Sequence, residues 1–134
     1  MSFAENYKEI YSIAKDIYLH PELGYKEFRT SKIVEDFILK YCPDIKIQKF
    51  STTGLRVDLP KSSKNSLNMV YMAELDAVYT PTHFHADKET GAAHNCGHYS
   101  QVAIALSLFK ELLLTEEYKN IDYNICLLYT SDAA

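Results

Sequence analysis

The stretch LNMVYMAELDA, residues 67–77, decides the fold of this chain of 134 residues. Its first seven residues are apolar apart from Asn68, which predicts a strand buried on both faces of a mixed sheet. Two carboxylates, Glu74 and Asp76, follow the apolar run. Ligands gather at the carboxyl ends of strands in open α/β sheets, so the pair could bind a metal or orient a ligand. Ordinary solvated charge after a strand is an equally common reason for such residues.

Two helices are predicted upstream of this strand. Apolar residues recur at helical spacing over residues 4–19 and again over residues 27–41. Pro21 and Pro43 follow the two runs, and proline cannot continue a helix. Gly24 lies between the runs and is expected to form the turn that joins them.

A hairpin is predicted between the second helix and the strand. Residues 45–50 and 55–59 alternate between apolar and polar side chains, and the link Ser51-Thr52-Thr53-Gly54 suits a turn. The alternation places the two charged residues of the second run on the solvent side. Residues 61–66 are expected to form a polar loop.

A long loop separates the apolar strand from a third helix. Residues 79–96 show no periodic pattern, and a loop of this length in a compact domain is usually functional. Residues 98–114 then read as a helix, and residues 121–125 begin another strand. The order of elements predicts an α/β fold in which a mixed sheet is flanked by helices.

The composition excludes several classes of function. Apolar residues make up 47% and charged residues 24%, which is enough for one folded domain with a core. The formal net charge of −4 and the lack of a basic tract argue against nucleic acid. No apolar run is long enough to span a membrane, and the charged N-terminus lacks the apolar core of a signal peptide, so we expect a cytoplasmic protein. Three cysteines, an odd and sparse set, argue against a disulfide scaffold.

The sharpest local pattern is His94-Asn95-Cys96-Gly97-His98. The Cys96 thiolate and the His98 imidazole can face one cation if the backbone bends, and Gly97 permits that bend. A cysteine–histidine pair suits zinc or another borderline transition ion. The alternative is structural, with Cys96 a small buried hydrophobe and His98 a residue that merely starts the third helix.

The other histidines are weaker candidates. His94 could bind metal itself or hold a metal-binding residue in place by a hydrogen bond, and the second role is favoured. His83 and His85 read as solvated loop residues, and His20 as a helix-end residue. A second hypothesis is nevertheless a small domain that binds a single structural or regulatory metal through His94, Cys96 and His98. It requires His83 or His85 as the fourth ligand, because a structural zinc site is closed by four protein ligands.

Three ordered segments carry a resemblance to a known family. They are His20-Pro21-Glu22-Leu23-Gly24 with Glu27 and Thr30-Ser31 after it, Met72-Ala73-Glu74-Leu75-Asp76-Ala77, and Asn95-Cys96-Gly97-His98-Tyr99. The second is similar to an Arg-Ala-Asp-x-Asp-Ala strand end and the third to an Ala-Cys-Gly-His-Asp metal motif. The chain resembles, over residues 6–125, the opening of the metal-dependent amidohydrolases of the aminoacylase/carboxypeptidase family. The most similar branch is that of the hippurate and indole-acetyl-amino-acid hydrolases.

The resemblance implies a truncated N-terminal part of a zinc-exopeptidase-like catalytic domain over residues 1–125. The parent enzyme would bind two divalent cations, zinc or manganese, and hydrolyse an amide bond in N-acyl amino acids or small peptides. Cys96 and His98 would be two of the metal ligands. Asp76 would support the site by holding a ligand in place without binding metal.

Two departures from the family pattern affect the surroundings of the proposed ligands but not the ligands themselves. Tyr99 stands where the family has an aspartate, so a local charge or hydrogen bond is lost or rebuilt. Met72 and Glu74 stand where the family has an arginine and an aspartate, which puts the local salt bridges in doubt.

Residues 126–134, CLLYTSDAA, are expected not to be native. They can be written in codons of the adaptor used in transposase-based sequencing libraries, although a natural strand end would also be apolar here. By resemblance, further metal ligands, a glutamate general base and a lid domain that forms a homodimer would lie downstream of Ile125. The chain by itself is therefore expected to be inactive.

Overall fold

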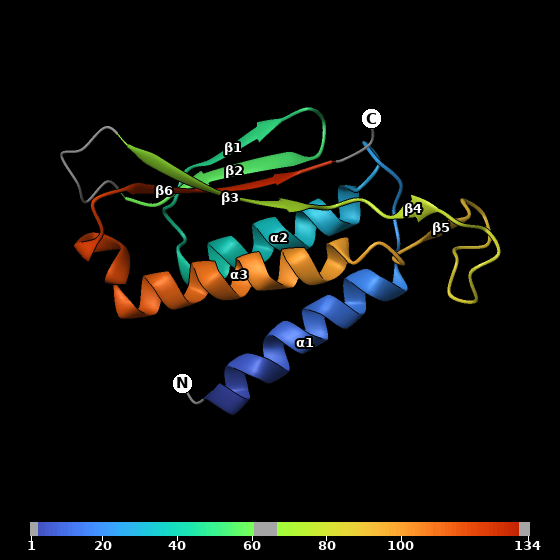
Figure 1. Cartoon of the computed structure of the whole chain (residues 1–134), viewed down its shortest axis with the longest axis horizontal. Coiled ribbons are helices and arrows are strands. Elements are labelled where there is room, and N and C mark those ends of the chain that lie inside the picture. The colour runs from blue at the N-terminus through green and yellow to red at the C-terminus, as the bar shows by residue number, and fades with distance from the viewer. Residues whose placement is uncertain (1–2, 61–66, 132–134) are drawn as a thin grey trace.

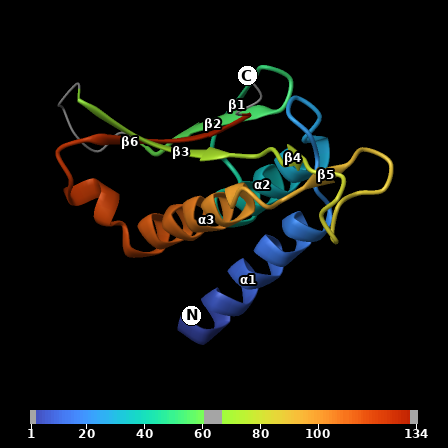
Figure 2. The ribbon, with the colours of Figure 1, turned by 45° about the vertical axis from the view of Figure 1, so that its right-hand side comes forward.

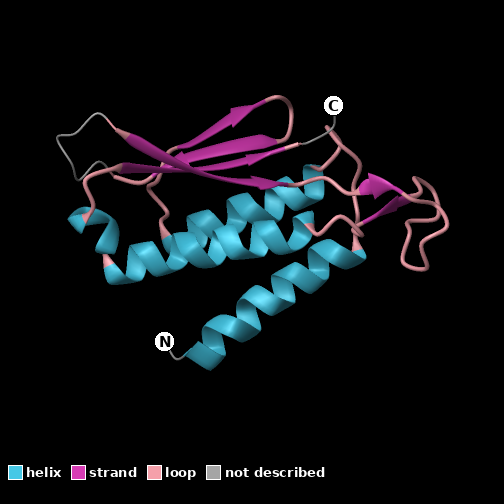
Figure 3. Ribbon diagram, in the orientation of Figure 1, coloured by secondary structure: helices cyan, strands magenta, loops and turns pink. Residues whose placement is uncertain are grey.

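The structure, a computed structural model, describes residues 3–60 and 67–131. It shows a four-stranded sheet whose helices all lie on one side, which confirms the predicted α/β class with a mixed sheet (Figures 1 and 3). The polar loop predicted at residues 61–66 lies outside the described residues. Within the described ranges, no helix has the combined length and hydropathy that crossing a bilayer requires.

The three predicted helices are present with nearly the predicted bounds. They are α1 (Phe3–Leu19), α2 (Phe28–Tyr41) and α3 (His98–Thr115). α2 and α3 pack against the sheet and α1 packs against α3, so the molecule has a sheet layer, a helix layer and one outer helix (Figures 1 and 2). A short 3-10 helix, η1 (Glu117–Asn120), connects α3 to the last strand.

The sheet has the strand order β1-β2-β6-β3. The strands are β1 (Ile47–Phe50), β2 (Gly54–Asp58), β3 (Asn68–Glu74) and β6 (Asn124–Thr130). β1 and β2 form the predicted antiparallel hairpin, and β6 pairs antiparallel with β2 and parallel with β3. β6 thus lies between the hairpin and β3 and joins them into one sheet.

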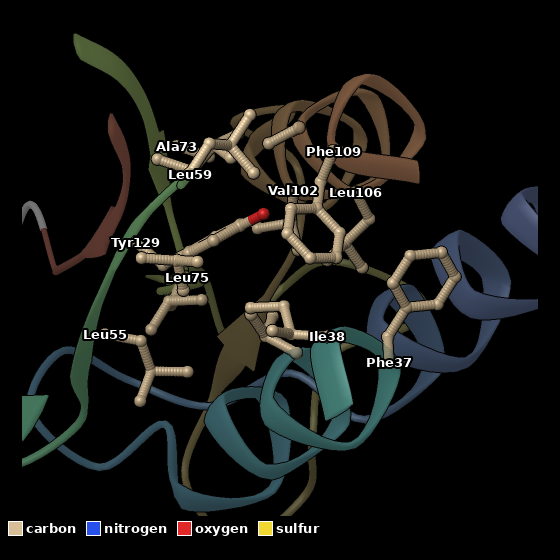
Figure 4. Close-up of a cluster of buried hydrophobic side chains, with 14 of the residues drawn as sticks. Phe37, Ile38, Leu55, Leu59, Ala73, Leu75, Val102, Leu106, Phe109 and Tyr129 are labelled. Carbon is tan, nitrogen blue, oxygen red and sulfur yellow. The ribbon is translucent and has the colours of Figure 1, made fainter. Parts of the chain in front are cut away.

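The core fills the space between the sheet and the two inner helices. Side chains from the two layers meet there, and Figure 4 shows ten of them labelled, among them Leu55, Leu106, Phe109 and Tyr129. Each of these four is at most 1% exposed, so the core is closed to water on this face of the sheet. Burial of apolar surface on this scale is the dominant favourable contribution to folding.

The prediction that the apolar strand is buried on both faces is wrong. β3 lies at an edge of the sheet, and Val70 and Met72 are 55% and 56% exposed. Side chains alternate along a strand, so Tyr71 and Ala73 face the helices while Val70 and Met72 face away from them. No helix of the described residues covers that second face (Figure 3).

The long loop predicted at residues 79–96 is more ordered than expected. β4 (Val78–Tyr79) and β5 (Ala92–Ala93) pair antiparallel and close the loop at its base. At the tip, the Asp87 carboxylate accepts hydrogen bonds from the backbone N–H groups of Glu89 and Thr90, and these bonds hold the pKa of Asp87 below its usual range. Two-residue strands are too short to leave an alternating pattern in the sequence.

Residues 126–130, part of the segment expected to be a translated adaptor, lie in β6. Leu127 and Tyr129 are fully buried, and the backbone of this segment pairs with β2 and β3. Any apolar run that favours a strand can fill this position, since sheet pairing is made by the backbone. The adaptor origin of residues 126–134 stays a prediction.

Candidate metal centre

The two groups of residues singled out in the sequence meet at one end of the sheet. β3 ends at Glu74 and α3 begins at His98, and Figure 1 shows both ends beside β4 and β5. The chain direction explains this, because α3 runs back along the sheet before β6 enters it parallel to β3. The carboxyl end of β3 and the first turn of α3 therefore share one edge, where ligands bind in open α/β sheets.

The backbone bends at Gly97, as the sequence predicts. Gly97 precedes the first turn of α3 with a φ of 90°, a conformation that residues with a side chain rarely adopt. The bend leaves Cys96 exposed, so the alternative of a buried structural cysteine is wrong. The Cys96 sulfur lies 3.9 Å from the main-chain oxygen of Asp76.

His98 connects the two carboxylates at the end of β3. Its Nδ1 donates a hydrogen bond of 2.8 Å to the main-chain oxygen of Asp76 and lies 3.3 Å from Asp76 Oδ1. Its Nε2 lies 2.8 Å from Glu74 Oε2. Both contacts are sheltered, because the side chain of His98 is 10% exposed and that of Asp76 is 6% exposed.

The structure therefore brings Asp76, Cys96 and His98 together, as the family resemblance implies. The contact between Glu74 and His98 was not predicted. The signal for it was present, since Glu74 and Asp76 are two residues apart on an extended chain and so project to the same side. Their common partner could not be identified without the tertiary fold.

His94 is buried beside this group without a hydrogen-bond partner. It is 2% exposed, and neither of its ring nitrogens is bonded within the described part of the chain. Burial, with the neighbouring charge of His98, lowers the pKa of His94 to about 4 against the opposing effect of Asp76. An unsatisfied buried polar group typically costs about 1–3 kcal/mol, so this imidazole indicates a place where another polar group would bind.

The first of the three segments that carry the family resemblance, residues 20–24, also reaches this edge of the sheet. Leu23 forms a parallel bridge with Ala77, and the Ala77 N–H donates a hydrogen bond of 2.7 Å to the main-chain oxygen of Glu22. The Glu22 carboxylate accepts hydrogen bonds from the backbone N–H groups of Arg29 and Thr30 in the first turn of α2. Glu22 thus joins the start of α2 to the chain just after Asp76.

Glu27, just after that segment, has a structural environment that the sequence did not reveal. Its side chain is fully buried, and Thr53 Oγ1 donates to its Oε2 at 2.7 Å. Thr53 belongs to the turn of the β1–β2 hairpin, while Glu27 immediately precedes α2. The pair therefore joins the hairpin to the helix layer.

The remaining histidines do not join the centre. His85 Nδ1 lies 2.9 Å from the Tyr18 hydroxyl, and His83 stacks on Phe84 with ring centroids 4.7 Å apart. At the end of α1, His20 Nδ1 donates a hydrogen bond of 2.8 Å to the main-chain oxygen of Asp16, as expected of a helix-end residue. Over residues 3–60 and 67–131, no three His, Cys, Asp or Glu side chains are grouped so that they could hold a metal ion. The closed site needed by the single-metal hypothesis has no support in this arrangement.

The donors at this edge nevertheless suit part of a divalent-metal centre. A thiol, an imidazole and carboxylates are the ligands that zinc takes in proteins, and carboxylates also suit manganese. The partnerless His94 adds an independent sign that a polar group belongs beside His98.

The chain is similar in sequence to parts of two curated hydrolases. No model of a known protein family matches the chain. The chain is 32% identical over 106 residues to N-acetyldiaminopimelate deacetylase of Bacillus subtilis, and 31% identical over 102 residues to thermostable carboxypeptidase 1 of Saccharolobus solfataricus. The matches cover 75% and 72% of this chain but 28% and 25% of the relatives, so the chain spans about a quarter of their length.

A solved structure shows the same fold. The chain superposes on a dinuclear metal-binding peptidase of the M20 family from Bacillus subtilis with a TM-score of 0.78 and 19% identity. The superposition covers 96% of this chain and 36% of that protein. Together with the deacetylase and carboxypeptidase matches, it confirms the resemblance of this chain to a segment of the amidohydrolase and peptidase family.

Proposed function

We propose that the chain is the N-terminal part of the catalytic domain of a metal-dependent amidohydrolase. The full protein hydrolyses an amide bond in an N-acyl amino acid or a small peptide. The observation that carries the proposal is the meeting of Asp76, Cys96 and His98 at the carboxyl end of β3, where His98 Nδ1 is 2.8 Å from the Asp76 main-chain oxygen. The similarity to a deacetylase and a carboxypeptidase indicates the class of bond.

Each of the three residues has a separate task in this proposal. Cys96 and His98 are metal ligands. Asp76 positions His98, because its main-chain and carboxylate oxygens face the N–H at Nδ1 of His98. The other ring nitrogen, Nε2, would then be available to the metal. Gly97 provides the bend that lets both ligands face one ion.

Two divalent ions, zinc or manganese, are the cofactors of the proposed enzyme. When bound, such ions generate a hydroxide near neutral pH and polarise the amide carbonyl. By resemblance, Cys96 and His98 are two of the ligands and the general base lies downstream, so this chain would hold part of a centre. Formation of a homodimer through a lid domain and a location in the cytoplasm stay predictions that follow from the resemblance alone.

The first experiment is to sequence the parent gene beyond the codon for Ile125 and to assay the full-length protein. A Glu-Glu pair soon after the strand, histidines further on, and metal-dependent hydrolysis of acetylated amino acids or hippurate are expected. Cys96→Ser should abolish that hydrolysis. A stop codon or an unrelated downstream sequence would overturn the proposal.

The second experiment tests whether this chain is only a part. The chain of 134 residues should not hydrolyse hippurate or acetyl amino acids measurably with added zinc or manganese, because loss of a general base alone typically costs about 10²–10⁴-fold. It should be made with residues 126–130 in place, since these residues lie in β6 between β2 and β3. Turnover that disappears in Cys96→Ser would show that the centre is complete in this chain.

A further inference from the structure

The two edges of the sheet differ in how well they are protected from pairing with another chain. β1 forms one edge and β3 the other (Figure 1). β1 has only four residues, and its Lys49 pairs with Glu35 of α2. Short edge strands that carry a lysine resist pairing with a further strand. β3 has seven residues, and the six from Asn68 to Ala73 include no charged residue and no proline, so β3 lacks these protections.

The backbone of β3 presents hydrogen-bonding groups to the open side of the sheet. The main-chain groups of Leu67 and Leu75 bond to β6, so the odd-numbered positions of this strand point their N–H and C=O groups toward β6. Val70 and Met72 lie at the alternate positions and therefore point theirs away from β6. No strand among the described residues pairs with that side of β3.

α3 is apolar on the side that lies nearest this edge. α3 packs against β3, and its Lys110 lies over the Tyr41 ring of α2, so the Lys110 side of the helix faces α2. Phe109, which is 100° further around the helix, faces the core. Another 100° in the same direction brings Leu108, with Ile104 beside it, to the side turned away from α2. Ile104 is more than half exposed, and exposed apolar side chains next to an open strand edge indicate an interaction surface.

We propose that a second copy of this chain pairs with β3 edge to edge and joins the two four-stranded sheets into one. The two β3 strands run antiparallel, because a two-fold axis relates the identical edges. A register centred on Tyr71 lets both outward-pointing residues pair. Val70 of each copy then lies opposite Met72 of the other, and each such pair exchanges two backbone hydrogen bonds. This inference does not depend on the proposed metal centre.

Charge and helix spacing favour a second copy as the partner. In this register the Glu74 side chains of the two copies lie at opposite ends of the strand pair, so like charges do not meet. α3 contacts both β3 and β6, which places it about one strand spacing from the two-fold axis. The two α3 helices would then lie about 10 Å apart, a normal distance for packed helices. Ile104 and Leu108 of each copy would be covered by the other helix.

Sedimentation equilibrium of the full chain at increasing concentration measures the association. Val70→Lys should raise the dissociation constant of the dimer about tenfold or more, because it places a charge opposite Met72 on both sides of the axis. Val70 is 55% exposed in the single chain, so lysine should leave the fold of one chain intact. Gln48→Lys is the matched control. It adds the same charge to an exposed position of β1 at the other edge, and it should leave the dissociation constant unchanged.

Disulfide formation tests the register of the strand pair. The Tyr71 Cα atoms of the two copies would be about 4.5 Å apart at the axis, which a disulfide can bridge. Tyr71→Cys should therefore give a cross-linked dimer under mild oxidation. Val70→Cys is the control, because its two Cα atoms would be diagonal to each other and about 9 Å apart, too far for a disulfide. Both variants also carry Cys96→Ser, which removes the exposed native thiol.

The outcomes are distinct. A mass that rises to twice that of one chain, weaker association in Val70→Lys but not in Gln48→Lys, and a cross-link in Tyr71→Cys but not in Val70→Cys support the inference. A chain that stays monomeric up to about 0.5 mM overturns it. Association that Val70→Lys does not weaken overturns it too, because another surface must then be responsible. So do species larger than a dimer, since pairing uses the β3 edge of both copies. Far-ultraviolet circular dichroism checks that each variant folds, and the Val70→Lys comparison decides alone if Tyr71→Cys does not.

Discussion

The substitution Glu9→Gln should destabilise the chain through a buried ion pair that joins the three helices. The Glu9 carboxylate on α1 lies 2.6 Å from Lys110 Nζ on α3 and 2.6 Å from Lys40 Nζ on α2. The side chain of Lys110 is 1% exposed, and its ammonium also lies over the Tyr41 ring at 4.6 Å. Glutamine keeps the shape of Glu9 but leaves the buried ammonium without its negative partner.

The magnitude follows from the pKa of Glu9. Burial would raise this pKa, but hydrogen bonds from Lys110, Lys40 and Tyr41 outweigh burial and lower it from 4.5 to about 2. That difference corresponds to about 3 kcal/mol of folding free energy carried by the ionised group. Breaking a buried pair by removing one partner typically costs about 3–5 kcal/mol, which agrees. The midpoint of thermal unfolding should fall by roughly 10 °C.

Urea unfolding of the chain and the variant across pH is the assay. Because the folded-state pKa lies below the unfolded one, the contribution is complete above pH 4.5 and is lost as the pH falls toward about 2. The difference between the two proteins should therefore be largest near neutral pH and disappear in acid. Lys40→Met is the matched control, since Lys40 is 61% exposed and its pair with Glu9 should contribute less than about 1 kcal/mol. The reasoning would be refuted if the Glu9→Gln variant were as stable as the unsubstituted chain at pH 7. It would also be refuted if the difference in unfolding free energy between the two proteins persisted at pH 2.

Three other substitutions test the core and the centre by the same urea assay. Tyr129→Phe should raise the unfolding free energy by about 1 kcal/mol, because the Tyr129 hydroxyl is buried without a hydrogen-bond partner among the described residues. A loss of stability would show that the hydroxyl is hydrogen-bonded. Leu106→Ala should cost about 2–5 kcal/mol through the cavity it leaves, since Leu106 is 0% exposed; a cost below 1 kcal/mol would mean that the core is loosely packed. Gly97→Ala should lower the unfolding free energy by about 1–2 kcal/mol because Gly97 has a φ of 90°. It should also weaken the binding of cobalt(II) at the candidate metal centre by turning Cys96 away from His98. Unchanged stability and unchanged cobalt binding would show that the bend is not needed.

Local patterns predicted the elements of this fold well, because each depends on residues close in sequence. The spacing of Ile10, Ile13 and Ile17 placed α1, and the alternation around Arg56 placed β2. The burial of β3 could not be predicted, since it depends on which strands and helices lie beside it. An apolar run alone does not distinguish a central strand from an edge strand.

The centre was predictable where a motif keeps its residues close together. Cys96 and His98 are two residues apart, and the family resemblance supplied Asp76. The contacts that the sequence did not reveal join distant positions, such as Lys110 and Glu9, which are 101 residues apart. The burial of Glu27 and the lack of a partner for His94 also arise only when separate elements pack together.

The position of β6 has a consequence for the order in which the chain folds. The hairpin of β1 and β2 can form as soon as it is synthesised. Among the described residues, β3 has no direct pairing with the hairpin and joins the sheet through β6. Asn68 of β3 and Asn124 of β6 are 56 residues apart, so this pairing has a high loop-closure cost and should be slow. On the ribosome, the backbone of β3 must therefore stay unpaired until β6 emerges. Folding yield should accordingly depend on temperature and on chaperones that shield exposed strands during synthesis.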